Sequence, residues 1–243
     1  MNLNKLFLTN NECYKAGKKI TVKGIMVHST GANNPWLKRY LPDDGKIGKN
    51  QYGNHWDTAR PGGIQVCVHG FIGKLADGSV ATYQTLPWNH RGWHAGGSAN
   101  NTHIGFEICE DGLSDSTYFN AVYKEAVELC AYLCKEYGLT EKDIICHSEG
   151  YKKGIASNHG DVMHWFPKHG KSMDTFRSDV KKLLSGNTST VVTELTTVND
   201  IVWELAHRGI ISNSALWLKK LEEDTNSYWL ARKTANYLRN KNV

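Results

Sequence analysis

The order of apolar and polar positions predicts several short strands in the first 150 residues. One mostly apolar run has no alternation, which is typical of a buried strand, and two alternating runs flank the tight-turn sequence Ala76-Asp-Gly-Ser79. Two further short runs are rich in Ile and also predict strands. The strands are therefore expected at residues 23–28, 64–73, 80–85, 103–110 and 143–146.

Helical periodicity occurs between and after these strands. In residues 118–137 apolar side chains recur every three or four positions, and Gly138 ends the pattern. Residues 173–184 predict a second, shorter amphipathic helix. Residues 31–63 contain Asn, Gly, Pro and aromatic residues without a period, so we expect a long functional loop. The alternation of strands and helices predicts an α/β domain.

The composition changes near residue 185. A polar, Thr-rich segment at 185–196 predicts a linker between a first domain, residues 1–184, and a small all-α module, residues 197–243. About 45 residues is small for an independent core, so we expect the module to dimerise or to pack on a partner. Its three helical patterns lie at residues 198–208, 214–223 and 227–240.

Charge and hydropathy exclude some classes of protein. The formal net charge of +5 comes without a polybasic block, so no nucleic-acid partner is expected. The chain has no apolar run long enough for a membrane span, and the Asn-rich first ten residues do not have the pattern of a signal peptide. Of the six cysteines, four lie in apolar strand or helix patterns and none has zinc-finger spacing. We therefore expect synthesis in a reducing cytosol.

Potential metal ligands are concentrated in residues 145–166, where a predicted strand runs into a Gly-rich loop. Such loops often display metal-binding and catalytic side chains. This stretch offers His147, His159, His164 and Asp161. A catalytic zinc takes three protein ligands and keeps one position for water, so another ligand is expected from elsewhere in the chain.

Two residues in predicted strands complete the candidate site. His28 ends the strand at 23–28, which brings it to the same sheet edge, although a lone histidine at a strand end is often an ordinary hydrogen-bonded residue. Glu107 lies in the middle of the strand at 103–110, where a carboxylate requires a partner. Glu107 is therefore either a paired structural carboxylate or a catalytic group.

Five short motifs, in this order, resemble those of the type 2 N-acetylmuramoyl-L-alanine amidases, a zinc amidase family that includes peptidoglycan recognition proteins. The motifs are His28, the hairpin from His69 to Gly78, Trp93-His-Ala-Gly-Gly97, Ile104-Gly-Phe-Glu107 and Cys146-His147. The resemblance covers about the first 184 residues. It implies a mixed central sheet flanked by helices, a bound Zn²⁺, and hydrolysis of the bond between N-acetylmuramic acid and L-alanine in peptidoglycan.

The resemblance also implies roles for single residues. The first two zinc ligands of the family fall on His28 and His147, and the third falls on Asp161, although the gap from His147 is longer than in typical members. His159 then takes the position of a catalytic cation that stabilises the oxyanion. Glu107 takes the position of the catalytic base. The alternative, in which Asp161 caps a turn and His164 binds the metal, stays open.

The resemblance further suggests residues that contact the substrate. Trp93, His94 and Asn101 are expected to touch the glycan or the peptide stem, and His69 is a weaker candidate for the wall of the site. A Trp in a turn is, however, more often a packing residue.

The C-terminal module resembles short helical modules of some Gram-positive phage amidases, which implies binding to a cell-wall polymer. The two-part layout resembles phage endolysins, so we expect the protein in the host cytoplasm and, after release, at the wall. Met173 could start shorter copies that assemble with the full chain. Two rival functions remain: a non-catalytic peptidoglycan-recognition module, and a zinc amidase that acts on another acyl amide.

Overall fold

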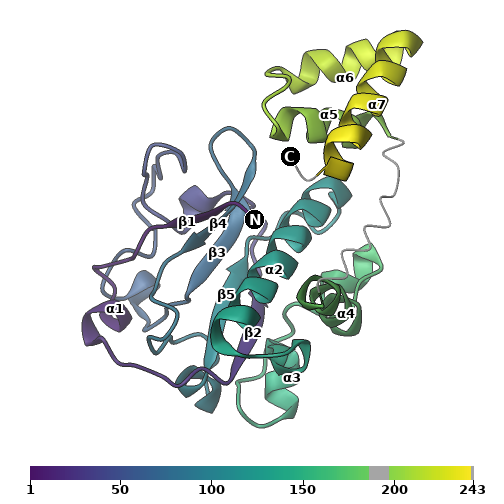
Figure 1. Ribbon diagram of the computed structural model, residues 1–243. Coiled ribbons are helices and arrows are strands. Elements are labelled where there is room, and N and C mark those ends of the chain that lie inside the picture. The colour runs from purple at the N-terminus through teal and green to yellow at the C-terminus, as the bar shows by residue number, and fades with distance from the viewer. Residues whose placement is uncertain (186–196, 242–243) are drawn as a thin grey trace. The chain divides into compact units, whose positions relative to one another are not determined.

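A six-stranded mixed sheet forms the centre of the N-terminal part of the protein (Figure 1). The computed structural model describes residues 1–185 and 197–241. The strand order is β1-β4-β3-β5-β2-β6, with β3 and β4 antiparallel and the other neighbouring strands parallel. The strands are β1 (Leu3–Lys5), β2 (Gly24–Ser29), β3 (Gly70–Lys74), β4 (Val80–Gln84), β5 (His103–Ile108) and β6 (Ile144–Cys146). The predicted α/β fold with a mixed sheet is confirmed.

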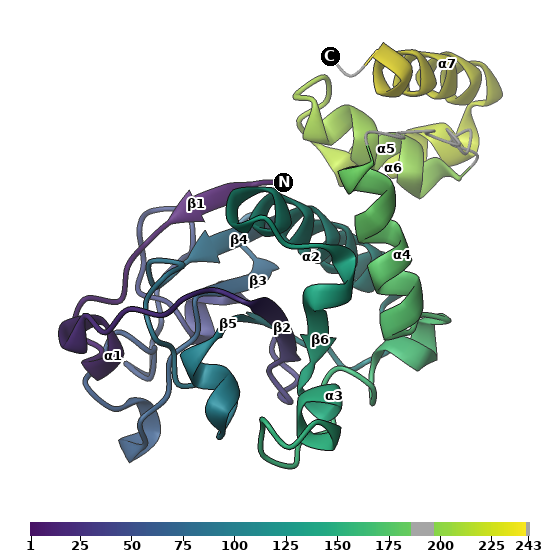
Figure 2. The ribbon, with the colours of Figure 1, turned by 60° about the horizontal axis from the view of Figure 1, so that its bottom comes forward.

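Two long helices cover one face of this sheet (Figure 2). Helix α2 (Ser116–Tyr137) begins where the side chain of Asp115 accepts a hydrogen bond from the amide of Tyr118, and it ends at Gly138 in the left-handed conformation. Helix α4 (Met173–Leu184) packs beside it. Because side chains alternate along a strand, every second residue of β2 and β5 enters the core beneath these helices. These residues are Ile25, Val27, Ile104, Phe106 and Ile108.

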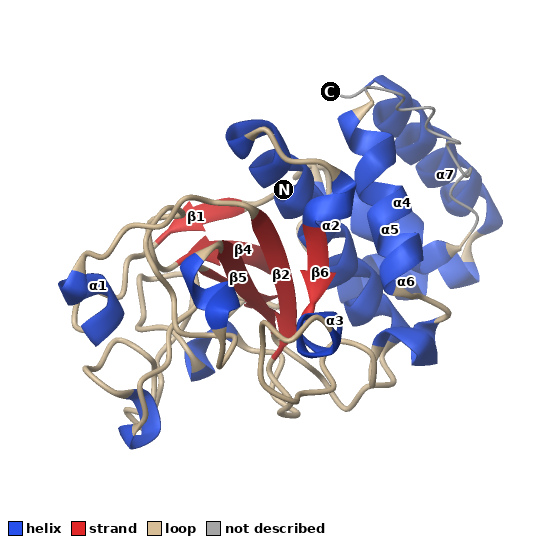
Figure 3. Cartoon of the chain, turned by 90° about the horizontal axis from the view of Figure 1, so that it is seen from below, coloured by secondary structure: helices blue, strands red, loops and turns tan. Residues whose placement is uncertain are grey.

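The alternation directs the remaining side chains of β2 and β5 to the opposite face, and these include His28 and Glu107. A second apolar core occupies part of that face, with Leu37, Tyr40, Leu41, Phe71 and Tyr83 among its members. The parallel strands β2, β5 and β6 end at one edge of the sheet, and α3 (His147–Lys152) starts there directly after β6 (Figure 3). Such an edge is where open α/β sheets bind ligands.

Element boundaries differ from the sequence-based expectations mainly before β3. The strand expected at residues 64–73 starts only at Gly70, because the preceding segment pairs outside the sheet, where Cys67 forms an isolated bridge with Trp93. Strand β1 and helix α1 (Glu12–Ala16) were not predicted. Short 3-10 turns occur at Leu37–Arg39, Pro61–Gly63, Ser98–Asn101, Glu141–Asp143 and Phe166–His169.

Cys13 and Cys67 form a disulfide, which the sequence did not predict. The two residues lie 54 positions apart, in α1 and in the segment before β3, and nothing local in the sequence links them. These are the two cysteines for which the sequence left the pairing open. The remaining four, Cys109, Cys130, Cys134 and Cys146, are free and buried, as the apolar patterns predicted.

The chain divides into two compact units, Met1–Gly186 and Asn187–Val243. The described part of the second unit contains α5 (Val198–His207), α6 (Ser214–Glu223) and α7 (Thr225–Lys241). These helices share a small core that includes Ile201, Val202, Leu205, Leu221 and Ala235. Most of the predicted linker lies outside the described residues. No helix of the described ranges combines the length and apolar character that crossing a bilayer requires.

Candidate metal centre

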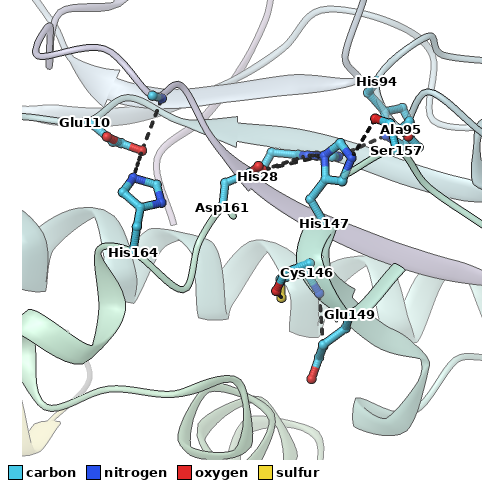
Figure 4. Close-up of polar contacts among 12 residues, drawn as sticks. His28, His94, Ala95, Glu110, Cys146, His147, Glu149, Ser157, Asp161 and His164 are labelled. Carbon is cyan, nitrogen blue, oxygen red and sulfur yellow. Dashed lines mark hydrogen bonds and ion pairs between the residues drawn. The ribbon is translucent and has the colours of Figure 1, made fainter. Parts of the chain in front are cut away.

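Three ligand atoms from distant parts of the chain converge at the edge of the sheet (Figure 4). His28 Nδ1 lies 3.1 Å from Asp161 Oδ2 and 3.1 Å from His147 Nδ1. The third side of the triangle, from His147 Nδ1 to Asp161 Oδ2, measures 3.8 Å. These are two imidazole nitrogens and one carboxylate oxygen, the donor types that zinc takes from proteins.

The triangle fits a tetrahedral metal ion. Bonds of about 2.0–2.1 Å to a tetrahedral zinc separate neighbouring ligand atoms by about 3.3 Å. The observed sides of 3.1, 3.1 and 3.8 Å bracket that value. When His28 Nδ1 carries no proton, the lone pairs of the three atoms face one another. When it carries one, that proton cannot form a hydrogen bond with both Asp161 and His147. The arrangement therefore calls for a bound cation.

Local structure explains how the ligands reach this place. His28 is the penultimate residue of β2, and His147 is the first residue of α3. The start of α3 is held by Glu149, whose carboxylate accepts a hydrogen bond from the amide of Cys146 and is bound by both terminal nitrogens of Arg177. The carbonyl of Asp161 accepts a hydrogen bond from the amide of Ser148, which ties the Gly-rich loop to α3.

The three groups shift each other's protonation in the metal-free protein. Burial opposes a charge on His28, but the hydrogen bond that its Nδ1–H donates to Asp161 and the negative charges of Glu107 and Asp161 outweigh burial and raise the pKa of His28. Burial and the neighbouring His28 lower the pKa of His147 to about 4. The pKa of Asp161 is lowered because its hydrogen bond and charge interaction with His28 outweigh burial. Asp161 and His147 are thus held in the forms that bind metals.

Glu107 lies beside this cluster, opposite His28 in the register of β2 and β5. Its Oε2 is buried and has no hydrogen-bond partner among the described residues. Burial, helped by the negative charges of Asp161 and Glu110 and opposed by His28, raises its pKa to about 7. Glu107 forms no ion pair within residues 1–185 and 197–241, so the structure gives no support to the interpretation of Glu107 as a paired structural carboxylate. A carboxylate with a pKa near 7 is suited to proton transfer at neutral pH.

The two other histidines of the loop take different positions. The ring of His159 is exposed and lies 4.7 Å from the ring of His147, centroid to centroid, at the border of the cluster. His164 turns toward Glu110 instead, with 2.9 Å between Nε2 and Oε1. Figure 4 shows this pair apart from the three converging ligands. The structure thus brings Asp161, and not His164, to His28 and His147.

The residues expected to touch substrate divide into two groups. His69 is fully buried, its Nδ1 accepts a hydrogen bond from the amide of Gly105, and its Nε2 donates to the carbonyl of His90. Burial lowers its pKa to about 4. His94 also has both ring nitrogens bonded, one to His28 and one to the carbonyl of His103. Both nitrogens of each ring are thus engaged within the protein, and substrate contact by His69 and His94 stays a prediction.

Trp93 and Asn101, in contrast, are exposed and remain candidates for substrate contact. Arg91, which the sequence analysis did not select, joins them: its guanidinium stacks 4.5 Å from the centre of the Trp93 ring, and its Nε donates to Asn101 Oδ1. Its position two residues before Trp93 in the sequence was the signal that could have identified it. Ser157, which contacts His147, had no such signal.

Comparison with known proteins identifies a family. A family model described as N-acetylmuramoyl-L-alanine amidase matches residues 18–164. A probable N-acetylmuramoyl-L-alanine amidase of Bacillus licheniformis is 33% identical over 94 residues, which is 39% of this chain and 24% of that protein. The amidase XlyA of Bacillus subtilis strain 168 is 38% identical over 68 residues, or 27% of this chain and 22% of that protein. The matched stretches thus span about a quarter of these relatives.

Solved structures share the fold. The catalytic domain of XlyA superposes with a TM-score of 0.51 at 22% identity, covering 74% of this chain and 99% of that one. The Staphylococcus aureus hydrolase AmiA, solved with its ligand, gives a TM-score of 0.52 at 20% identity, covering 77% of this chain and 86% of that one. At this level of identity the likeness concerns the fold alone. The family model matches more than half of this chain. The chain therefore belongs to the N-acetylmuramoyl-L-alanine amidase family known as Amidase_2.

Proposed function

We propose that this protein hydrolyses the amide bond between N-acetylmuramic acid and L-alanine of peptidoglycan with Zn²⁺ as its cofactor. The observation that carries the proposal is the convergence of His28, His147 and Asp161 beside Glu107, whose buried Oε2 has no hydrogen-bond partner in the part of the chain that the structure describes. Membership of the amidase family supports the choice of substrate. The donor set supports zinc, since two imidazoles and one carboxylate form a three-ligand site with room for water.

A bound zinc ion would supply Lewis-acid polarisation of the amide carbonyl and activation of water. The side chains of the protein then carry out proton transfer, stabilise the oxyanion and bind the substrate. Glu107 accepts the proton of the attacking water and returns it to the amine nitrogen of L-alanine as the C–N bond breaks. His159, at the border of the cluster, would donate a hydrogen bond to the oxyanion when protonated. Trp93, Arg91 and Asn101 offer an exposed surface for the glycan or the peptide stem.

The test is hydrolysis of purified Gram-positive peptidoglycan by the full chain. We expect free amino groups to appear without new reducing sugar ends, to stop after a chelator removes the metal, and to return when zinc is added. Wall that is bound but not cleaved by the zinc-loaded protein would support the recognition module instead. Cleavage of other acyl amides with the wall left intact would support the second rival function.

We propose a wall-polymer ligand and a role as a phage endolysin for the two-part chain. In the C-terminal unit, Trp217 and Tyr228 pack against the core, whereas Trp229 and Leu230 are 49% and 70% exposed. Exposed aromatic and apolar side chains are typical of binding surfaces. In this proposal the protein accumulates in the host cytoplasm and acts at the wall after release. Binding of the isolated unit to purified walls, with and without their secondary polymers, tests it.

Copies that start at Met173 and pair through the C-terminal unit remain a further proposal. Met173 is itself buried at the start of α4, and Phe176 and Val180 of this helix lie in the core beneath α2. A shorter product would expose these side chains, unless α4 unfolds or finds another partner. A denaturing gel of the purified protein, with mass spectrometry of any short band, decides whether such copies exist.

A further inference from the structure

Both imidazole ligands are hydrogen-bonded through the nitrogen that points away from the cluster. His28 Nε2 lies 3.0 Å from His94 Nδ1, and His94 Nε2 lies 3.1 Å from the carbonyl oxygen of His103. A carbonyl oxygen only accepts, so the proton of His94 is on Nε2. His94 Nδ1 is then an acceptor, which requires that the proton of neutral His28 be on Nε2. The lone pair of His28 Nδ1 is thereby directed at the cluster.

These hydrogen bonds, from His28 through His94 to the carbonyl of His103, form one relay. A second relay, from His147 through Ser157 to the carbonyl of Ala95, acts in the same way. His147 Nε2 lies 3.2 Å from Ser157 Oγ, and the Ser157 hydroxyl donates to the carbonyl of Ala95 at 3.3 Å. Having given its only proton to Ala95, the Ser157 oxygen accepts the proton of His147 Nε2. His147 Nδ1 is again left with its lone pair facing His28 and Asp161.

Both relays depend on the same short segment. Asn100 is buried, and its Oδ1 accepts hydrogen bonds from the amides of His94 at 2.9 Å and Ala95 at 2.8 Å. The amide of Ser157 donates to Ala95 at 2.8 Å, so Ser157 is held to this segment twice. Asn100 therefore fixes the turn that positions His94 for one relay and the carbonyl of Ala95 for the other.

Two glycines make the close approach possible. A Cβ on Gly105 would lie 2.4 Å from His94 Nδ1, inside the imidazole ring's contact distance. A Cβ on Gly96 would lie 2.5 Å from Ser157 Oγ. The Trp-His-Ala-Gly-Gly and Ile-Gly-Phe-Glu motifs of the sequence thus acquire a structural reason: they leave space for the groups that hold the ligands.

We propose that His94 and Ser157 are positioning residues that select the tautomers of His28 and His147 and so prepare the site for zinc. The inference rests on the proposed zinc-dependent function, and it gives His94 a role in the site other than substrate contact. Outer hydrogen-bond partners of metal-bound histidines fix ring orientation and tautomer, and their loss typically lowers metal affinity by about 10–100-fold.

The test measures zinc affinity by competition with a chelator in the full chain. We expect His94→Leu, Ser157→Ala and Gly105→Ala each to weaken zinc binding by about 10–100-fold. His94→Asn, which keeps an oxygen acceptor near the position of Nδ1, should recover part of the affinity. Ser178→Ala, an exposed serine of α4, is the matched control and should bind zinc as the wild type does. Thermal unfolding of the metal-free variants identifies any that fail to fold.

Nitrogen-15 NMR of the histidine rings gives a second measurement that requires no variant. With zinc bound, the rings of His28 and His147 should both carry their proton on Nε2, and the neutral ring of His147 should do so without zinc as well. A proton on Nδ1 of His147, or zinc affinities equal to the wild type in folded His94→Leu and Ser157→Ala, would overturn the proposal. If the wild-type chain binds no zinc, the proposed function fails, and the NMR measurement still decides whether the relays exist.

Discussion

His28 Nδ1 and Asp161 Oδ2 lie 3.1 Å apart although 133 positions separate the two residues in the chain. The parallel pairing of β2 with β6 creates this proximity, because it brings the end of β2 next to the start of α3 and its following loop. The third ligand, His147, comes from the first turn of that helix. Two segments that lie far apart in the sequence thus complete one three-ligand site.

The geometry predicts which residue of the Gly-rich loop holds the metal. Asp161→Ala should lose zinc by more than the roughly 10–100-fold typical of outer partners, because it removes a direct ligand. His164→Ala should keep zinc, since the His164 ring pairs with Glu110 and not with the cluster. Zinc content after dialysis, measured by mass spectrometry of metals, compares the two variants directly. The reverse outcome would make His164 the ligand.

Glu107→Gln separates metal binding from catalysis. The substitution keeps the size of a half-buried side chain whose buried Oε2 has no hydrogen-bond partner among the described residues, but it removes the group that accepts a proton. We expect zinc affinity near that of the wild type and a loss of amide hydrolysis of about 10²–10⁴-fold, the usual contribution of a general base. Zinc titration and amino-group release are measured on the same preparation. Full activity in the variant would exclude Glu107 as the base.

Hydrophobic periodicity was sufficient for the central strands and long helices, because each buries a regular face. The alternation that places Ile25 and Val27 in the core also directs His28 to the opposite face, and it is visible in the sequence. The disulfide between Cys13 and Cys67 was not predictable, since nothing in the sequence indicates that these two segments, 54 positions apart, lie side by side. Pairing between distant loops is a property of the tertiary structure alone.

The candidate site shows the same division between local and tertiary information. Residue type and order in the chain identified His28, Glu107, His147 and Asp161, which the structure brings together. The same reasoning proposed His94 for substrate contact, and it could not reveal that both ring nitrogens are bonded within the protein. Hydrogen-bond partners depend on packing across the sheet, so the role of a histidine inside a site can be assigned only when the fold is known.

His69 should make the stability of the protein depend on pH. Its folded-state pKa, lowered by burial to about 4, lies below its ordinary value of 6.5. The unfolded chain therefore binds more protons between pH 6.5 and about 4, and the stability that His69 contributes at neutral pH is lost as the pH falls through this window. The expected loss is about 3 kcal/mol.

The measurement is the free energy of unfolding in urea at several pH values. His69→Gln cannot titrate, so its stability should fall less steeply than that of the wild type between pH 6.5 and 4. Replacement of the partly exposed His55 by Gln is the control and should keep the wild-type slope. Equal slopes for the wild type and His69→Gln would contradict this origin of the acid sensitivity.

The Cys13–Cys67 disulfide should stabilise the first unit. It closes a loop of more than 50 residues and so restricts the unfolded chain, which is typically worth about 2–4 kcal/mol. A reductant should lower the melting temperature of the wild type. In the double variant Cys13→Ser and Cys67→Ser, the lower melting temperature should no longer respond to the reductant. A wild type that is insensitive to reduction would show that the bond contributes nothing.

The first unit should act without the second. All six strands, the three converging ligands and Glu107 lie within residues 1–185, and this part of the chain forms its own compact unit with its own cores. A truncated chain of residues 1–185 is therefore expected to fold, bind zinc and cleave soluble peptidoglycan fragments as the full chain does, because none of these properties uses residues 197–241. Circular dichroism, zinc titration and amino-group release check the three expectations in turn.

The truncated chain of residues 1–185 should sediment less with intact wall particles than the full chain does, since the exposed Trp229 and Leu230 are removed. Undiminished sedimentation would show that the catalytic unit alone holds the wall, and the proposed role of the C-terminal helices would then be wrong.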